Sequence, residues 1–240
     1  MAAESFKKLK VDHKTVLVRD MTAFRNLRDF LLNNGYQNVY ETERVGEEKT
    51  AMATFACRNT IHGECLAVVY GLSSSDEVAH PQAPFVYGFR GTAPGAAVTY
   101  IQHLALRTTD LFKLRRYLEE KGAQFLTPIY QDKDSFGPLL QSFTRELFDD
   151  EWFFIEFVQR DYDPDKLGTK AGVQFVNKTV QSLYVSKQEE FREWLRTKKK
   201  RKFLDGLSSA AGKKLLGEII ENIEPSGYAR TVPPLARATA

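Results

Sequence analysis

Two of the four histidines in this 240-residue chain stand in matching sequence contexts. His13 opens the segment HKTVLVRD and His103 opens HLALRTTD, so each precedes a strand-like apolar stretch that ends at an aspartate, Asp20 or Asp110. Each aspartate occupies the N-cap position of a helical pattern that follows it. If the two segments fold alike, the two imidazoles face each other from equivalent strands. Because neutral imidazole is a common ligand of transition metals, the pair predicts part of a metal centre.

A carboxylate supplies the third candidate ligand. Glu156 is surrounded by apolar residues in the strand-like run WFFIEFV, which covers 152–158. A buried carboxylate without a partner costs several kcal/mol, roughly, so Glu156 requires a cation. Together with His13 and His103 it forms the 2-His-1-carboxylate set. The open coordination positions of that set suit non-haem Fe(II) and O₂ chemistry.

Taken singly, each of these residues also fits a structural role. His13 fits a surface histidine at the start of a strand, and His103 fits a hydrogen-bonded core residue. Glu156 fits a carboxylate that pairs with an arginine or lysine across a sheet. The repeat-related placement of the two histidines favours the metal site. Of the other histidines, His62 lacks the P-C-x-x-C partner of a zinc-deaminase signature and is expected in a loop, whereas His80 precedes a proline and is expected to face solvent.

Two consecutive βαβββ patterns position these side chains. Alternating or β-branched runs predict strands and apolar spacings of three and four predict helices. The first module covers about 10–72. Its first strand is expected in VDHKTVLV and its helix over Met21–Asn33. Three strands are expected after it, at Gln37–Glu41, Lys49–Arg58 and Glu64–Gly71, with a turn at Val45–Glu48. The second covers about 96–160, with a strand in VTYIQHLALRTTD, a helix over Leu111–Lys121 and strands at Gln124–Thr127, Pro138–Phe143 and Trp152–Gln159. A Ser-, Pro- and Gly-rich connection, Ser73–Gly95, joins the modules.

This duplication predicts an α+β fold in which two tandem βαβββ modules form one open barrel with a cup between them. We expect residues 1–175 to form the metal-binding barrel and 176–224 to add a helical lid and extension, with helices at Thr179–Arg196 and Leu204–Asn222. Residues 225–240 are expected to be a disordered tail. The basic run Arg196–Lys202 is expected to be a solvated helix end.

Composition excludes several classes of protein. The chain is 42% hydrophobic, too apolar for a disordered protein, and its formal net charge is +3, so no nucleic-acid partner is expected. It has two cysteines, no apolar run long enough to span a membrane and no signal-peptide pattern, which predicts a soluble, cytoplasmic protein with no membrane partner. The phosphate-cradling and serine-hydrolase motifs are absent from the sequence.

Three segments carry a resemblance to a known family: Val98–Gly122 (VTYIQHLALRTTDLFKLRRYLEEKG), Gly137–Thr144 (GPLLQSFT) and Phe153–Arg160 (FFIEFVQR). In combination and order they resemble the C-terminal domain of 4-hydroxyphenylpyruvate dioxygenase, of the vicinal oxygen chelate superfamily. The similarity extends more faintly to Val11–His13 and to Asn177–Tyr184, and it covers most of 11–190.

The resemblance implies a vicinal oxygen chelate barrel holding Fe(II) through His13, His103 and Glu156. It further implies that the substrate-binding pocket contains Gln102, Gln141, Phe143 and Tyr184. The implied activity is that of an Fe(II)-dependent dioxygenase. In that reaction a 2-oxo acid that resembles an arylpyruvate undergoes oxidative decarboxylation and hydroxylation, with O₂ as the oxidant.

Departures from the family pattern leave the substrate open. The family's N-terminal barrel has no counterpart in this sequence, and the connection DEVAHPQAPFVYGFRGTAPG matches neither the Asn-Glu-Pro element nor the Ser-Gln-Ile stretch of the family. Two alternatives therefore stand beside the 2-oxo acid dioxygenase. One is another vicinal oxygen chelate enzyme, either an extradiol dioxygenase or a glyoxalase-type isomerase, and the other is a catalytically silent binding module. A homodimer is compatible with such modules, whose edge strands often pair.

Overall fold

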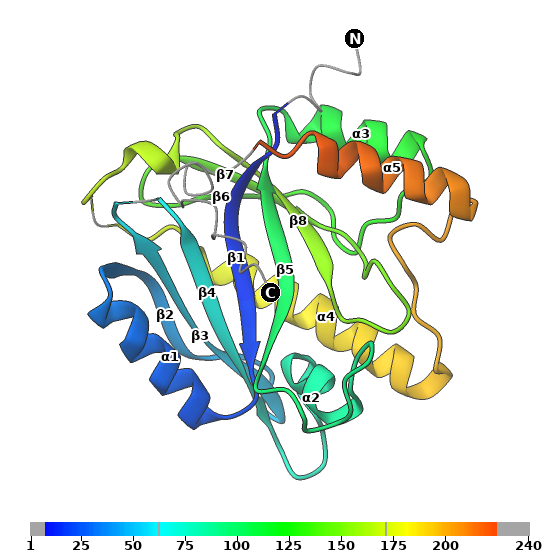
Figure 1. The fold of residues 1–240 in the computed structure, drawn as a ribbon, viewed down its shortest axis with the longest axis horizontal. Coiled ribbons are helices and arrows are strands. Elements are labelled where there is room, and N and C mark those ends of the chain that lie inside the picture. The colour runs from blue at the N-terminus through cyan, green and yellow to red at the C-terminus, as the bar shows by residue number, and fades with distance from the viewer. Residues whose placement is uncertain (1–7, 62, 171, 225–240) are drawn as a thin grey trace, which may run out of the picture.

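The computed structural model describes residues 8–61, 63–170 and 172–224. Its centre is one eight-stranded mixed sheet with the strand order β2-β3-β4-β1-β5-β8-β7-β6, which curls into an open half-barrel (Figure 1). The strands are β1 Lys10–Val18, β2 Tyr36–Gly46, β3 Thr50–Asn59, β4 Cys65–Ser73, β5 Thr99–Arg107, β6 Tyr130–Lys133, β7 Pro138–Phe143 and β8 Phe154–Arg160.

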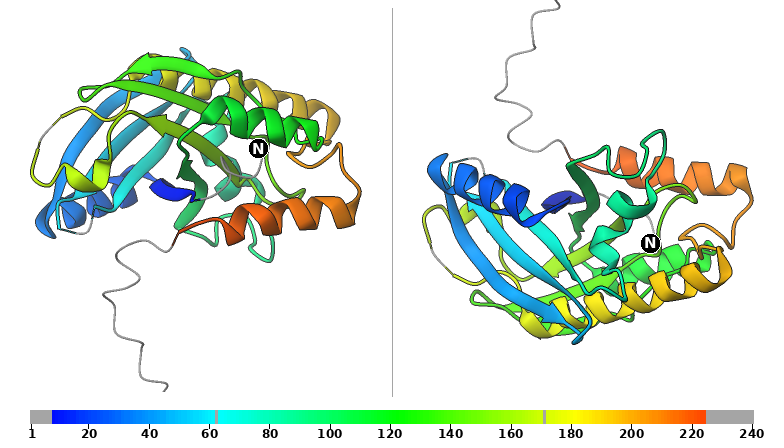
Figure 2. Two further views of the ribbon diagram at one scale, coloured as in Figure 1. Left: turned by 90° about the horizontal axis from the view of Figure 1, so that it is seen from above. Right: turned by 90° about the horizontal axis from the view of Figure 1, so that it is seen from below.

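Helices cover both faces of this sheet, as the two views in Figure 2 show. The long helix α4 lies across the concave face, whereas α1, α3 and α5 lie on the opposite side. The helices are α1 Met21–Asn33, α2 Ala83–Tyr87, α3 Leu111–Glu120, α4 Asn177–Thr197 and α5 Ser209–Glu221, with short 3₁₀ helices at His80–Gln82 and Pro164–Lys166. Asp20 and Asp110 cap α1 and α3 by accepting the backbone N–H of Ala23 and Lys113.

The predicted duplication is confirmed by the element order and by the sheet. Each module runs strand, helix and three strands, and the first strand of each pairs in parallel with the last: β1 with β4, and β5 with β8. The two modules meet where β1 pairs antiparallel with β5 at the centre of the sheet. This arrangement relates the two halves by an approximate two-fold axis, which is the α+β open barrel that the sequence predicts.

Among the apolar clusters of the described residues, three large ones hold the layers together. The outer face of the first module packs on α1 through Phe24 and Leu31. The outer face of the second module packs on α3 and α5, with Leu114 and Ile219 buried. The concave face packs on α4, where Tyr184 is fully buried. Because burial of one such side chain contributes about 1.5–3 kcal/mol, these clusters fix both the sheet and the helix that roofs its hollow.

Several predicted boundaries are wrong. Gln124–Thr127 is not a strand, since it precedes Pro128, which cannot donate to a ladder, and Phe125 forms only an isolated bridge to Thr144. The strand at this place is β6, from Tyr130. β2 continues into the turn predicted at Val45–Glu48 and ends at Gly46.

At the C-terminal end, α5 begins only at Ser209, because the Ser208 side chain caps it. The basic run is only partly solvated: Lys200 is nearly buried and pairs with Glu146. Among the described residues, none of the helices combines the length and apolar character that a membrane crossing needs. The predictions for His62 and for residues 225–240 lie outside the described residues.

Candidate metal centre

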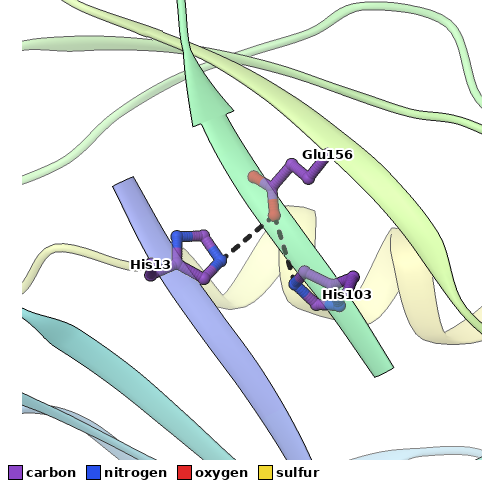
Figure 3. Close-up of side chains that lie close together, drawn as sticks. All are labelled: His13, His103 and Glu156. Carbon is purple, nitrogen blue, oxygen red and sulfur yellow. Dashed lines mark ion pairs between the residues drawn. The ribbon is translucent and has the colours of Figure 1, made fainter. Parts of the chain in front are cut away.

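The three candidate ligands converge in the hollow of the sheet (Figure 3). His13 projects from β1, His103 from β5 and Glu156 from β8, and all three are buried. Oε2 of Glu156 lies 3.2 Å from Nε2 of His13 and 3.4 Å from Nε2 of His103. One ligand atom of each residue lies within 4.8 Å of the others. The structure therefore brings together the three residues that the sequence singled out, from strands far apart in the chain.

Two β-bulges aim the histidines into the hollow. In the pairing of β1 with β5, Asp12 is an extra residue before His13, and Gln102 is an extra residue before His103. Each bulge residue contacts Nδ1 of the histidine after it. Oδ2 of Asp12 lies 3.0 Å from Nδ1 of His13, and Oε1 of Gln102 lies 3.2 Å from Nδ1 of His103. These contacts orient both rings and leave each Nε2 directed to the shared point near Glu156.

The two modules differ at the third ligand. Glu156 pairs with Ala105, two residues after His103, and the equivalent pair in the first module is Ala67 with Thr15, two residues after His13. Ala67 lines the same pocket but offers no ligand atom. The duplicated fold thus supplies two imidazoles and one carboxylate. A set of three protein ligands leaves coordination positions for other molecules.

The buried charged groups of the site shift one another's pKa values. Burial opposes ionisation of Glu156, but the two imidazoles outweigh it and lower the pKa of Glu156 to about 2. Burial also opposes protonation of His13, yet Glu156 and Asp12 outweigh it and raise the pKa of His13 to about 9. Burial lowers the pKa of His103. The carboxylate is thus ionised and is balanced by a proton on His13.

The residues present fit a divalent transition metal. The donor set is two imidazole nitrogens and one carboxylate oxygen, and the Nδ1 atom of each imidazole already has a partner, Asp12 or Gln102. A cation at the meeting point takes the place of the proton that balances Glu156. His13, His103 and Glu156 are therefore the residues that would hold a metal.

An apolar pocket surrounds this meeting point. It lies between the concave face of the sheet and α4. The four residues predicted to bind substrate, Gln102, Gln141, Phe143 and Tyr184, all line it. Most of the remaining wall is apolar and comes from both modules and α4: Met52, Val69, Phe154, Phe175, Val180 and Leu183.

Sequence analysis missed several other pocket residues, including His80, Thr15 and Lys187. His80, expected in solvent, is buried at 7% exposure, because its 3₁₀ helix is tucked under α4 and its backbone N–H donates to Gln188. Oγ1 of Thr15 lies 2.9 Å from Nε2 of His103. Because alternate residues of a strand share a face, the position of Thr15 two residues after His13 could have indicated that it faces the same pocket. Lys187 follows Tyr184 by three residues, the spacing that places two side chains on one helix face.

Gln141 has a defined role in this geometry, because its Nε2 donates to Oε1 of Glu156 at 2.7 Å. Replacing Gln141 by leucine leaves that carboxylate oxygen without its donor, and we expect metal affinity to fall about 10–100-fold. Anaerobic Fe(II) titration measures the effect. Gln159→Leu is the matched control, since Gln159 accepts from the backbone N–H of Leu111 and does not line the pocket. Equal metal affinities in the two variants would contradict this role.

Comparison with known proteins adds a fold relationship. No family model and no curated protein matches the chain. Among solved structures, a mutant of 4-hydroxymandelate synthase from Streptomyces coelicolor superposes with a TM-score of 0.60 at 20% identity, over 76% of this chain and 54% of that one. The chain thus spans about half the length of that protein.

Two other solved structures superpose less well. Methylmalonyl-CoA epimerase from Mycobacterium tuberculosis gives a TM-score of 0.41 at 18% identity, over 63% of this chain and 88% of that one. A xylose isomerase-like TIM barrel/4-hydroxyphenylpyruvate dioxygenase fusion protein gives 0.43 at 15% identity, over 74% and 29%. The paired βαβββ modules, the curled eight-stranded sheet and the match to the synthase show that this chain has the vicinal oxygen chelate fold.

Proposed function

We propose that the protein is a non-haem Fe(II)-dependent dioxygenase that acts on a 2-oxo acid, resembling an arylpyruvate, by oxidative decarboxylation and hydroxylation. The observation that carries the proposal is the buried set of His13, His103 and Glu156 at one end of an apolar pocket. This donor set is typical of oxygenases that bind a substrate and O₂ at the same metal.

Bound Fe(II) would supply the site for chelation of the 2-oxo acid and for activation of O₂. The chain's own residues determine which substrate side chain fits the pocket. The rings of Phe143, Phe154 and Phe175 offer apolar and aromatic surface on which an aryl group packs. Helix α4 closes the concave face above them, so the reacting groups are held away from bulk water.

A panel of 2-oxo acids tests this function. The protein is loaded with Fe(II) anaerobically and exposed to O₂ with phenylpyruvate, 4-hydroxyphenylpyruvate or an aliphatic 2-oxo acid. We expect O₂ uptake matched by an equal amount of CO₂ for at least one acid, and a hydroxylated acid that has lost CO₂ and gained both atoms of O₂.

Other outcomes assign the site to a different class. O₂ uptake without CO₂ release, on a catechol, would make the protein an extradiol dioxygenase. Turnover without O₂ would make it a metal-assisted isomerase. A failure to bind Fe(II) would contradict an iron-dependent function and favour a silent binding module.

A further inference from the structure

One wall of the pocket carries a buried cation. The side chain of Lys187, from α4, is 4% exposed, lines the cavity and lies 4.8 Å above the ring of Phe154. The same ring stacks on His103, with 4.6 Å between centroids. Lys187 therefore lies near the candidate metal ligands without touching them. A lysine in a largely apolar pocket requires an explanation, because burial disfavours its charged form.

The surrounding charges keep Lys187 protonated. Its Nζ donates to Glu146 at 3.1 Å and to Glu190 at 2.6 Å, and these carboxylates outweigh the effect of burial and raise the pKa of Lys187. Arg145 pairs with Glu190 at 2.8 Å, and Lys200 pairs with Glu146 at 2.9 Å. Lys187, Arg145 and Lys200 thus form one cluster with Glu146 and Glu190. Its three cations exceed its two carboxylates by one formal positive charge.

Lys187 also has hydrogen-bonding capacity to spare. An ammonium group has three N–H donors, and the described residues accept two of them, through Glu146 and Glu190. The two carboxylates hold the ammonium at the cavity wall, which reduces the entropy that a ligand must overcome. The remaining donor and the excess charge together favour an anionic group in the pocket.

Three more polar atoms in this cavity have no partner among the described residues: Nδ1 of His80, Oγ1 of Thr54 and Oε1 of Gln141. Thr54 pairs with Val69, and Val69 pairs with Leu17, four residues beyond His13. At about 3.3 Å per residue, Thr54 lies roughly 13 Å along the strands from the level of His13. His80 comes from the connection that leaves β4 at that same end. The pocket thus has polar groups away from the candidate metal centre, and leaving each of them buried without a partner is unfavourable.

We propose that Lys187 is a substrate-binding residue for an anionic group on the side chain of the substrate, so that the preferred substrate is a 2-oxo acid bearing a second anionic group. His80 and Thr54 offer further hydrogen bonds to the substrate side chain. The 2-oxo acid part of this inference rests on the proposed function, whereas the anion site rests on Lys187 and its cluster. A purely structural Lys187 would serve only to neutralise Glu146 and Glu190.

Matched ligands separate these two roles. Calorimetry on the anaerobic Fe(II) protein measures the affinities of 4-carboxyphenylpyruvate and 4-methylphenylpyruvate, and of 2-oxoadipate and 2-oxohexanoate. In at least one pair we expect the native protein to bind the anionic acid at least tenfold more tightly. Lys187→Met is expected to remove that preference, and Lys187→Arg to retain most of it.

Lys200→Met is the matched control, because Lys200 pairs with the same Glu146 but does not line the pocket. It is expected to lower the melting temperature and keep the preference. If Lys187→Met fails to fold, the double variant Glu146→Gln/Lys187→Met is used in place of the single variant, because it keeps the formal charge of the cluster.

Each outcome decides the inference. Equal affinities within both ligand pairs in the native protein, or the same loss of preference in Lys200→Met as in Lys187→Met, would overturn the anion site while leaving the dioxygenase proposal standing. Lys187-dependent selectivity without O₂ uptake on any acid would support the anion site and overturn the dioxygenase. Failure of all four acids to bind would overturn both.

Discussion

Replacing Glu156 by alanine is expected to abolish both Fe(II) binding and turnover while the fold persists. Oε2 of Glu156 is the atom that both Nε2 atoms approach, so its loss leaves two imidazoles, which hold Fe(II) far more weakly than the full set. His13 is raised in pKa mainly by Glu156 against burial, and without that carboxylate it can release its proton. The variant therefore need not carry an unpaired buried charge.

Iron content after anaerobic reconstitution, O₂ uptake and the melting temperature together measure this effect. His103→Ala is expected to behave in the same way, since it removes the second imidazole from the set. Glu41→Ala is the control: Glu41 is an exposed partner of Arg28 and does not line the pocket, so iron content is expected to be unchanged. Native iron content and full turnover in Glu156→Ala would eliminate the triad as a metal centre.

The largest loss of stability is expected from Arg160→Met. Arg160 ends β8, its side chain is 1% exposed, and its guanidinium donates to Asp12, Asp134 and the backbone carbonyl of Gln174. Removing the cation leaves two buried carboxylates without their main partner, and breaking a buried pair in this way typically costs about 3–5 kcal/mol of unfolding free energy. Asp12 also contacts Nδ1 of His13, so the support of the candidate metal centre is weakened with it.

Urea denaturation of the native protein and the variant measures this loss. Arg28→Met is the matched control, because Arg28 pairs with Glu41 and Asp29 in solvent and such pairs contribute about 0–1 kcal/mol. A loss below about 1 kcal/mol in Arg160→Met would mean that the network around Asp12 contributes little to stability.

Much of the fold follows from local signals in the sequence. The caps at Asp20 and Asp110, the apolar spacings of α1 and α3 and the alternation in β1 and β5 act within a few residues, so they can be recognised without tertiary information. Errors arose where long-range pairing decides. β2 extends to Gly46 because its pairing with β3 resumes at Val45 and Gly46, and 124–127 is excluded from the ladder next to Pro128.

The candidate site divides in the same way. The repeat placed His13 and His103 on equivalent strands, and the apolar run around Glu156 marked a buried carboxylate, so the sequence by itself determined which residues could form a metal centre. Tertiary structure decided how they are supported. The bulges at Asp12 and Gln102 arise from the register between two strands about ninety residues apart in the chain, which no local pattern encodes.

Tertiary structure also decided the character of the pocket. His80 lies in a segment with the composition of a solvent-exposed loop, but its packing beneath α4 removes it from water. Lys187 belongs to a helix whose other charged residues face solvent in part, and only the contacts to Glu146 and Glu190 make its burial possible. A buried charge is tolerated when partners from distant segments compensate it. For that reason the sequence determined the duplicated scaffold and its three candidate ligands, whereas the buried cation in the pocket wall emerged only from the folded chain.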